Sequence, residues 1–322
     1  MALDAKQEGL VIGVVGAGAM GRGIAQVAAV GGCLVKLYDA KEGEASEAQA
    51  FIRKMLERNV DKGRMAQEDL EDTTDRIEVI NSMSEFAGSQ CIIEAVIESL
   101  DVKHVVFKEL ESIVSDDCVI ATNTSSLSIS AIASACKKPE RVAGLHFFNP
   151  VPLMKLVEVI DGVLTDPVVG DFLMVLGRRF GRESIRVKDA PGFLVNQVGR
   201  GYNIESTHIA MDGVADFADI DRILRDAVGF RMGPFQLLDL TALDVTHPAT
   251  EMIYNQFYHE PRYRPATMLQ MRLDAGLLGS KVGRGFYEYL EGNMQVGVEP
   301  PAPAYDGRAV WVSMAIPEFG EK

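Results

Sequence analysis

The sequence predicts an α/β chain in which a doubly wound sheet is followed by an all-α C-terminal domain. Short runs of branched apolar residues alternate with longer helical patterns in the first half of the chain. This alternation is typical of a parallel sheet with helices on both faces. After Pro191 the runs become long and amphipathic, with few strand-like segments, which indicates a second, helical domain.

The strands are expected where the short apolar runs occur. Between two of these runs, Val102, Val106 and Leu110 recur at helical spacing, so one stripe of a helix would face the sheet. The expected strands are 10–15, 34–38, 91–95, 119–122 and 142–146, with 156–160 and 185–187 extending the sheet.

The domain boundary is expected at 188–192, where Pro191 and Gly192 interrupt the strand pattern and Asp189 is a suitable helix cap. We therefore assign 1–188 to the sheet domain and 189–290 to the helical domain, with helical runs at 193–211 and 235–257. The remainder, 291–322, contains a Pro-rich linker at 299–303 and an extra strand-like run at 309–314.

The composition excludes several classes of partner. The net charge of −14, with 47% hydrophobic and 24% charged residues, argues against binding nucleic acid or an anionic membrane, because an acidic surface does not attract polyanions. No stretch is long and apolar enough to span a bilayer. The first nine residues carry no signal or transit pattern.

The cysteines lie far apart in the sequence, without paired spacing. We therefore expect reduced, mostly buried thiols in a cytoplasmic protein, and no metal site. These residues are Cys33, Cys91, Cys118 and Cys136.

A helical excursion is predicted at 46–72, and it carries the densest early cluster of basic residues. The cluster is either a solvated helix face or a docking surface for phosphates, and the residues alone leave both interpretations open. Its members are Arg53, Lys54, Arg58, Lys62 and Arg64.

A glycine-rich turn follows the first strand and opens the helical run 22–30. Gly16 permits the tight turn, Gly18 lets the backbone approach a pyrophosphate, and Gly21 lets the helix pack on the strand. The helix N-terminus then attracts the anion. This context predicts a Rossmann-type dinucleotide site formed by Gly16, Gly18, Ala19, Met20 and Gly21.

Asp39 ends the second strand, about twenty residues beyond the glycines, where a carboxylate can accept hydrogen bonds from the adenosine ribose. It would repel a 2′-phosphate, so we expect NAD rather than NADP. Lys41 nearby argues for the opposite preference, and an ordinary turn acid is the alternative interpretation of Asp39.

His146 stands at the end of an expected strand, and Glu158 lies twelve residues later in the next one. A carboxylate paired with an imidazole holds its tautomer and favours its protonated form, as a base that takes a hydroxyl proton requires. Taken alone, His146 would more often be a histidine with a structural role. Its neighbours favour a catalytic role.

The carboxyl ends of the strands in such a sheet face the ligand crevice. Further polar residues are expected there, beside His146. The run 123–126, which includes Ser125, closes another strand and could orient a substrate alcohol, or could cap the helix that follows. Asn196, early in the helix after Pro191, could add one polar group from the second domain, and by itself would be taken for a surface residue.

These residues resemble the L-3-hydroxyacyl-CoA dehydrogenase family over 10–289. The resemblance implies NAD-dependent oxidation of an L-3-hydroxyacyl-CoA to the 3-oxoacyl-CoA by hydride transfer. The matching motifs are 16–21, 94–98 with Lys103, 123–126, 146–150, 154–158, 189–196, 232–235 and 283–287.

The resemblance also implies a role for each matching residue. His146 would be the base, Glu158 its partner, and Ser125 and Asn196 catalytic residues that position the substrate. The cofactor would be lined, beside the glycine turn and Asp39, by Glu98, Lys103, Ser125, Asn149 and Lys281.

In the family the helical excursion contacts coenzyme A, which favours the phosphate-docking interpretation of 46–72. Lys62 would then contact the substrate, together with Ser125 and Asn196. Met55 occupies the position where family members can direct a serine toward the coenzyme, so the coenzyme A contacts are expected to differ there.

Segments 229–232 and 240–248 look like those of larger bacterial members that act on acyl chains from aromatic-acid breakdown, including 3-hydroxyadipyl-CoA dehydrogenases. A further domain follows in those proteins, and 309–314 would be its truncated beginning. Fatty-acid degradation by β-oxidation and phenylacetate catabolism are the pathways that this resemblance implies.

The acyl chain and the assembly give two further expectations. An arginine near the acyl terminus could bind a carboxylate, and the candidates are Arg231, Arg262 and Arg264, although surface arginines are the simpler interpretation. A homodimer is expected to bury an apolar surface of the helical domain. That surface would include Leu237, Leu238, Leu240 and Ile253.

Two other functions fit parts of the pattern. A non-catalytic relative, like the lens crystallins that share this fold, would not need Ser125, His146, Glu158 and Asn196 together. A dehydrogenase of free 3-hydroxy acids, as in the hydroxyisobutyrate group, has a similar glycine turn but relies on a catalytic lysine instead of a His–Glu pair.

Overall fold

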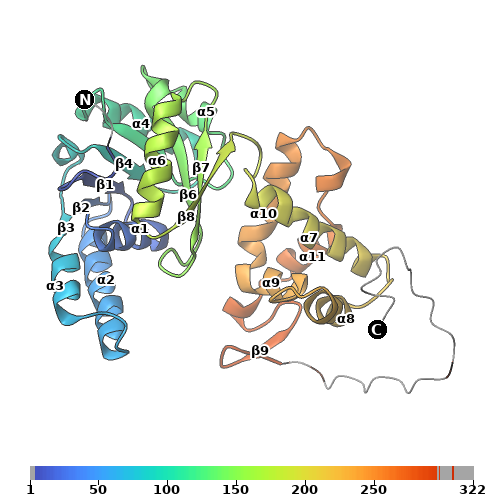
Figure 1. The fold of residues 1–322 in the computed structure, drawn as a ribbon. Coiled ribbons are helices and arrows are strands. Elements are labelled where there is room, and N and C mark those ends of the chain that lie inside the picture. Colours follow the sequence, from blue (N-terminus) through green and yellow to red (C-terminus); the bar gives the residue numbers. More distant parts are fainter. Residues whose placement is uncertain (1–3, 296, 298–306, 308–322) are drawn as a thin grey trace.

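The computed structural model describes residues 4–295, 297 and 307, and the runs 299–303 and 309–314 lie outside that part of the chain. A twisted sheet with helices on both faces is followed by a helical domain (Figure 1). The sheet has the strand order β3-β2-β1-β4-β5-β6-β7-β8. Its strands are β1 (Val11–Val15), β2 (Leu34–Tyr38), β3 (Ile77–Val79), β4 (Cys91–Glu94), β5 (Val119–Thr122), β6 (Val142–Phe147), β7 (Leu156–Asp161) and β8 (Glu183–Lys188).

The seven expected strands are all present, with two corrections to the sheet. β7 runs antiparallel to β6, so the sheet is not parallel throughout. β3 pairs with β2 at the edge and was not predicted. Its sequence, Ile-Glu-Val, has only three residues, which is too short for an alternating pattern to be recognised.

Two hydrophobic clusters, one on each face of the sheet, make it doubly wound. Ile24 of α1 (Ala19–Val30) and Leu173 of α6 (Pro167–Arg179) belong to one cluster. Phe107 of α4 (Leu100–Ile113) and Ile132 of α5 (Ile129–Ala133) belong to the other. The order of strands reverses between β2-β1 and β1-β4, and ligands of such sheets bind at this switch point, beyond the carboxyl ends of the strands.

The helical excursion consists of two helices, α2 (Glu44–Asp61) and α3 (Gln67–Asp75), where the sequence indicated one continuous segment. Gly63 lies between them with a φ of +67°, a backbone conformation that glycine adopts without steric cost. Both helices pack on the same face of the sheet as α1, through Ile52, Leu56 and Leu70.

The second domain is mainly helical and ends in a small hairpin. Its core contains Phe235, Leu238 and Phe286. The predicted helical run 235–257 is two helices, because Ala242 between them has a φ of +65°. The elements are α7 (Val195–Met211), α8 (Phe217–Arg222), the π-helical turn η3 (Ile223–Ala227), α9 (Pro234–Thr241), α10 (Leu243–Gln256), η4 (Pro261–Tyr263), α11 (Thr267–Asp274), η5 (Ser280–Val282), β9 (Glu288–Leu290) and β10 (Asn293–Gln295). The connections η1 (Met83–Phe86) and η2 (Pro139–Arg141) belong to the first domain.

The expected dimer surface needs correction. Leu238 and Ile253 are 0% and 1% exposed in the single chain, so neither side chain can form part of an external face. Leu240 is 60% exposed and remains available to a partner. Over the described ranges, no helix combines the length and apolarity that crossing a bilayer requires.

Three of the four cysteines are buried, and Cys136 is half-buried; all four are free thiols. The prediction of mostly buried cysteines is therefore confirmed.

Candidate active site

His146 and Glu158 form a buried pair at the ends of neighbouring strands. The antiparallel register of β6 and β7 sets the two residues directly opposite each other. Nδ1 of His146 lies 2.7 Å from Oε2 of Glu158, and both side chains are excluded from solvent. Glu158 therefore fixes the ring orientation and directs the imidazole proton to Nδ1, which leaves Nε2 as the nitrogen that can accept a proton.

The second oxygen of Glu158 binds the start of the helical domain. Oε1 accepts hydrogen bonds from the backbone N–H groups of Leu194 and Val195, at 2.9 and 3.0 Å, where α7 begins. A carboxylate is stabilised at a helix N-terminus by the unpaired N–H groups and the helix dipole. Asp189, which we expected to cap this helix, instead accepts bonds from Ile129 and Ser130 at the start of α5.

Aromatic rings enclose the imidazole of His146. The ring centroids of Phe148 and Phe193 lie 4.5 and 5.8 Å from it. Phe193 has a φ of +53° and follows Gly192, whose φ is +73°. This turn bends the chain so that the start of α7 reaches Glu158.

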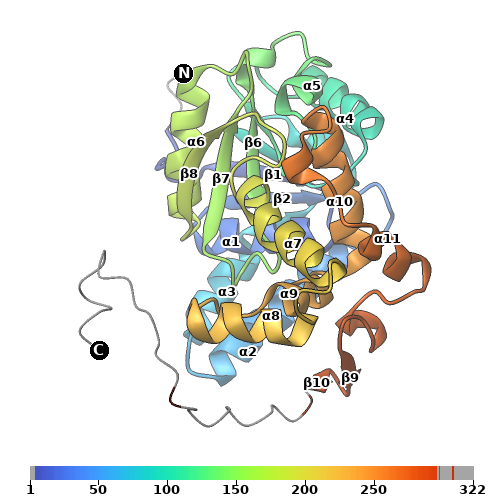
Figure 2. The same ribbon diagram turned by 90° about the vertical axis from the view of Figure 1, so that its right-hand side faces the viewer.

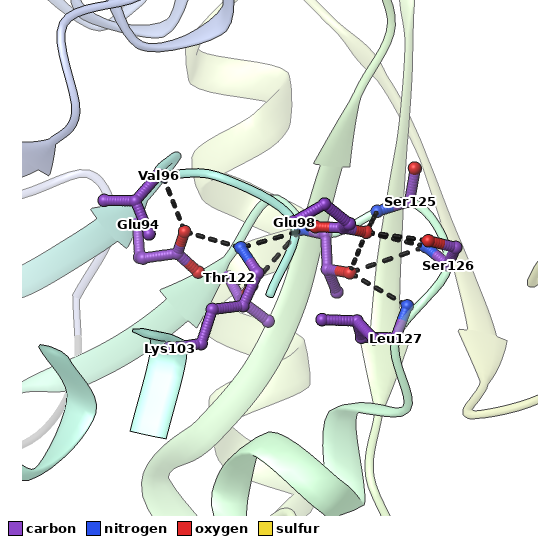
Figure 3. A network of polar contacts seen from close by, with 9 residues as sticks. Glu94, Val96, Glu98, Lys103, Thr122, Ser125, Ser126 and Leu127 are labelled. Carbon is purple, nitrogen blue, oxygen red and sulfur yellow. Dashed lines mark hydrogen bonds and ion pairs between the residues drawn. The ribbon is translucent and has the colours of Figure 1, made fainter. Parts of the chain in front are cut away.

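The loop that carries Ser125 is held by Glu98. One oxygen of Glu98 accepts bonds from Thr124 Oγ1 at 2.6 Å, from the Ser125 N–H at 3.0 Å, and from the N–H and hydroxyl of Ser126 at 3.2 and 2.9 Å. Figure 3 shows the Ser125 hydroxyl directed away from this network. Burial alone would raise the pKa of Glu98, but the Lys103 charge and the hydrogen bonds of the loop hold it below its usual value.

Lys103 lies beneath this loop, 1% exposed, between two carboxylates. Its ammonium is 2.6 Å from Glu94 and 3.5 Å from Glu98, as Figure 3 shows. Glu94 is fully buried and also accepts bonds from Thr122 Oγ1 and the Val96 N–H, each at 2.7 Å. No role was predicted for Glu94, although an acid at the end of the apolar run Cys-Ile-Ile-Glu is a signal for one.

Asn196 brings the helical domain to the Ser125 loop. Its Nδ2 donates to the Ser125 carbonyl at 3.4 Å. Gln256 of α10 donates to the neighbouring carbonyl of Ser126 at 2.8 Å. The expected residues Ser125 and Asn196 are therefore brought together. The side chain of Asn123 is engaged elsewhere, where its Oδ1 accepts the Phe147 N–H at 2.9 Å.

The glycine turn has the geometry that a dinucleotide site requires. Gly16 has a φ of +97°, and a Cβ there would lie 2.6 Å from the Ala95 carbonyl oxygen. A Cβ on Gly21 would lie 1.7 Å from the Gly16 carbonyl oxygen, whereas one on Gly18 would meet open space. No side chain caps α1, so its first N–H groups, from Ala19 and Met20 onward, can bind a phosphate.

Asp39, directly after β2, contacts the backbone of this turn. Its two oxygens accept bonds from the Ala17 N–H at 2.7 Å and the Lys41 N–H at 2.8 Å. The ammonium of Lys41 pairs with Glu44 at 2.7 Å, which reduces its ability to attract a 2′-phosphate. These contacts fix the carboxylate beside the phosphate-binding backbone, as NAD binding requires.

Three other expected residues take no part in the hydrogen bonds described above. Asn149 is exposed and is the second residue after the end of β6. Lys281 lies on η5 of the second domain, where it forms an ion pair with Asp244. Lys62 follows α2 and is exposed.

A doubly wound sheet, a glycine turn after its first strand and a buried His–Glu pair at its strand ends define a dinucleotide-dependent dehydrogenase. Residues 11–190 match the family model described as 3-hydroxyacyl-CoA dehydrogenase, NAD binding domain, and 192–289 match its C-terminal domain. The chain belongs to the 3-hydroxyacyl-CoA dehydrogenase family, which are NAD-dependent oxidoreductases.

Individual relatives agree with this assignment. The chain is 39% identical to the 3-hydroxyadipyl-CoA dehydrogenase of Escherichia coli over 91% of its own length, but it spans only 62% of that protein. It is 37% identical to a probable 3-hydroxybutyryl-CoA dehydrogenase of Bacillus subtilis, over 86% of this chain and 96% of the relative. The structure of (S)-3-hydroxybutyryl-CoA dehydrogenase from Ralstonia eutropha superposes with a TM-score of 0.85 at 34% identity, over 87% and 99% of the two chains.

Proposed function

We propose that this protein oxidises an L-3-hydroxyacyl-CoA to the 3-oxoacyl-CoA, with His146 as the general base. The buried His146–Glu158 pair at the strand ends is the observation that carries this proposal. NAD fits the glycine turn, since a Cβ would fill the space at Gly16 and Gly21 and the space above Gly18 is open. Bound NAD would accept the hydride from the 3-carbon.

The proton of the 3-hydroxyl would go to the protein and not to NAD. Nε2 of His146 would take the proton of the 3-hydroxyl while the C–H bond breaks, and the positive charge that forms on the ring would face Glu158 at 2.7 Å. A carboxylate at this distance stabilises an imidazolium. The three hydrogen bonds that Glu158 accepts hold it in place for this task.

Ser125 and Asn196 would position the substrate. Glu98 holds the backbone of the Ser125 loop and leaves the hydroxyl of Ser125 directed away from it, so that this hydroxyl can donate to the substrate oxygen. Asn196 lies against the same loop from the second domain. A substrate in this crevice would therefore contact both domains. Glu98 and Lys103 would support the loop, and Asn149 and Lys281 would contribute to the cofactor side.

The thioester carrier is the third part of the proposal. The exposed basic residues of α2, together with Lys62, offer charges for the phosphates of coenzyme A. Met55 is half-buried, with its sulfur 3.9 Å from an Arg58 nitrogen. It does not offer the hydroxyl that relatives can use there.

The proposed assembly is a homodimer that covers the exposed apolar residues Val198, Leu240 and Val245. We place it in the cytoplasm, in fatty-acid or aromatic-acid degradation, including phenylacetate catabolism.

The decisive experiment measures NADH formation with a panel of 3-hydroxyacyl-CoA thioesters and the corresponding free acids. We expect oxidation of thioesters only, and loss of it in a His146→Gln variant that still binds NAD. Oxidation of free acids at equal efficiency, or an active His146→Gln variant, would contradict the proposal.

A further inference from the structure

Arg200 is a buried cation one helical turn after Asn196 on α7. It is 9% exposed. Nη1 donates to Thr250 Oγ1 at 2.7 Å and to the Thr246 carbonyl at 3.3 Å, both on α10, and Nη2 donates to Asn196 Oδ1 at 3.5 Å. The shielded Nε has no hydrogen-bond partner. Figure 2 shows α7 and α10 next to each other in front of the sheet.

This guanidinium has no counter-ion in the described part of the chain. All its acceptors there are uncharged, whereas the buried Arg141 has the carboxylate of Glu111 at 3.5 Å. Burial lowers the pKa of Arg200 to about 10, as expected for a cation removed from water without a carboxylate. Keeping such a charge in the interior costs free energy unless an anion joins it.

The position of Arg200 matches the length of a short acyl chain. If the 3-carbon lies at His146, Ser125 and Asn196, the chain continues past Asn196. Arg200 Nη2 lies 3.5 Å from Asn196 Oδ1, so the guanidinium is next to the amide that would position the substrate. In a six-carbon chain the terminal carboxyl lies three carbon–carbon bonds beyond the 3-carbon, about 4 Å. A carboxylate at that point would be within reach of a charge-assisted hydrogen bond of about 2.8 Å from the guanidinium.

We propose that Arg200 binds a carboxylate at the far end of the acyl chain, so that the preferred substrate is a 3-hydroxy dicarboxylyl thioester. This inference rests on the function proposed above. It replaces Arg231, Arg262 and Arg264 as candidates, since all three are exposed. Arg200 was missed because its sequence context, Val-Gly-Arg-Gly-Tyr, does not distinguish a buried arginine from a surface one.

The test compares 3-hydroxyadipyl-CoA with 3-hydroxyhexanoyl-CoA, which have equal chain length and differ in the terminal carboxylate. We expect kcat/KM of the parent to favour the dicarboxylyl thioester at least about tenfold, equivalent to about 1.4 kcal/mol. In Arg200→Met this ratio should fall to about one. Disturbance of Asn196 alone would lower both activities and leave their ratio unchanged. Arg262→Met, at an exposed arginine of the same domain, should keep the parent ratio.

Activity of Arg200→Met toward the neutral chain shows that the variant is folded. If it is inactive toward both, Arg200→Lys takes its place, and its ratio should fall at least about threefold, because a lysine lacks the planar fork. Adipyl-CoA should also inhibit the parent more tightly than hexanoyl-CoA. A parent that oxidises both thioesters equally, or a variant that keeps the parent ratio, overturns the role of Arg200 and leaves the proposed function standing. A parent that oxidises neither overturns both.

Discussion

Glu158 Oε1 accepts the backbone N–H of Val195 at 3.0 Å, and this bond ties the strand that orients His146 to the first residue of α7. Asn196 is the next residue along that helix. The same carboxylate therefore sets the imidazole of the first domain and the amide that the second domain contributes. A change at Glu158 should disturb both groups at once.

Glu158→Gln should lower the oxidation rate by roughly 10²- to 10⁴-fold, the usual scale for losing an acid or base. A neutral amide stabilises an imidazolium far less than a carboxylate does. NAD binding, followed by titration of the nucleotide in fluorescence, should be retained because the glycine turn is untouched. A near-normal rate would show that the pair has been assigned wrongly.

NAD should be preferred to NADP by a large factor in kcat/KM, since the Asp39 carboxylate beside the glycine turn repels a 2′-phosphate. Asp39→Ala should weaken NAD binding by about 1–3 kcal/mol, the range for leaving a charge-assisted hydrogen bond unmade. Calorimetric titration measures the change. Equal efficiencies with the two nucleotides in the parent would refute the assignment.

Glu98→Gln should make stability depend less on pH. The pKa of Glu98 is lowered in the folded protein, so its carboxylate stabilises the fold above the ordinary pKa of a glutamate. This contribution is lost as the pH falls through the lowered folded pKa. Urea unfolding of parent and variant should differ most near neutrality and converge in acid. Glu109→Gln, on the exposed side of α4, serves as the matched control, and a pH-independent difference would count against the interpretation.

Asp239→Asn should destabilise the helical domain by about 1–3 kcal/mol. Its two carboxylate oxygens accept the N–H groups of Phe286 and Tyr287 at 2.8 and 2.9 Å, and an amide would oppose one of these donors with a second donor. Asp239 is completely buried. The free energy of unfolding in urea reports the loss. No measurable change would mean that the segment can detach from the carboxylate at little cost.

The protein should be a dimer at micromolar concentration. Its helical domain exposes the apolar side chains of Val198, Leu240 and Val245, and a partner chain that covered them would remove this surface from water. Light scattering should return about twice the 35.1 kDa of one chain. A mass near that of one chain would contradict the expectation, and Leu240→Glu should shift the equilibrium toward the monomer.

The sequence was sufficient for the elements whose signals are local. Gly16 and Gly21 were predicted from a glycine pattern with its strand and helix, and their close contacts agree with the reasons given. The antiparallel direction of β7 could not be predicted, because the apolar run 156–160 looks the same in either direction. The edge strand β3 was too short to be recognised.

Contacts between segments far apart in the sequence could not be predicted either. Asp189 was taken as a cap for the helix after it and caps α5 instead, because proximity in sequence was the only guide. Glu94 is notable because it pairs with the buried Lys103 in the folded chain. Arg200 is notable because its acceptors on α10 are uncharged. Neither environment is visible in a linear pattern.

The pairing of β6 with β7 also makes the His146–Glu158 contact a matter of register. Side chains on a strand alternate between faces, so a slip of a single residue would turn Glu158 to the opposite face of the sheet. The two strands are joined directly by the segment 148–155. A one-residue change in the pairing of these two strands would therefore abolish proton transfer in a protein whose remaining strands, and whose nucleotide site, are intact.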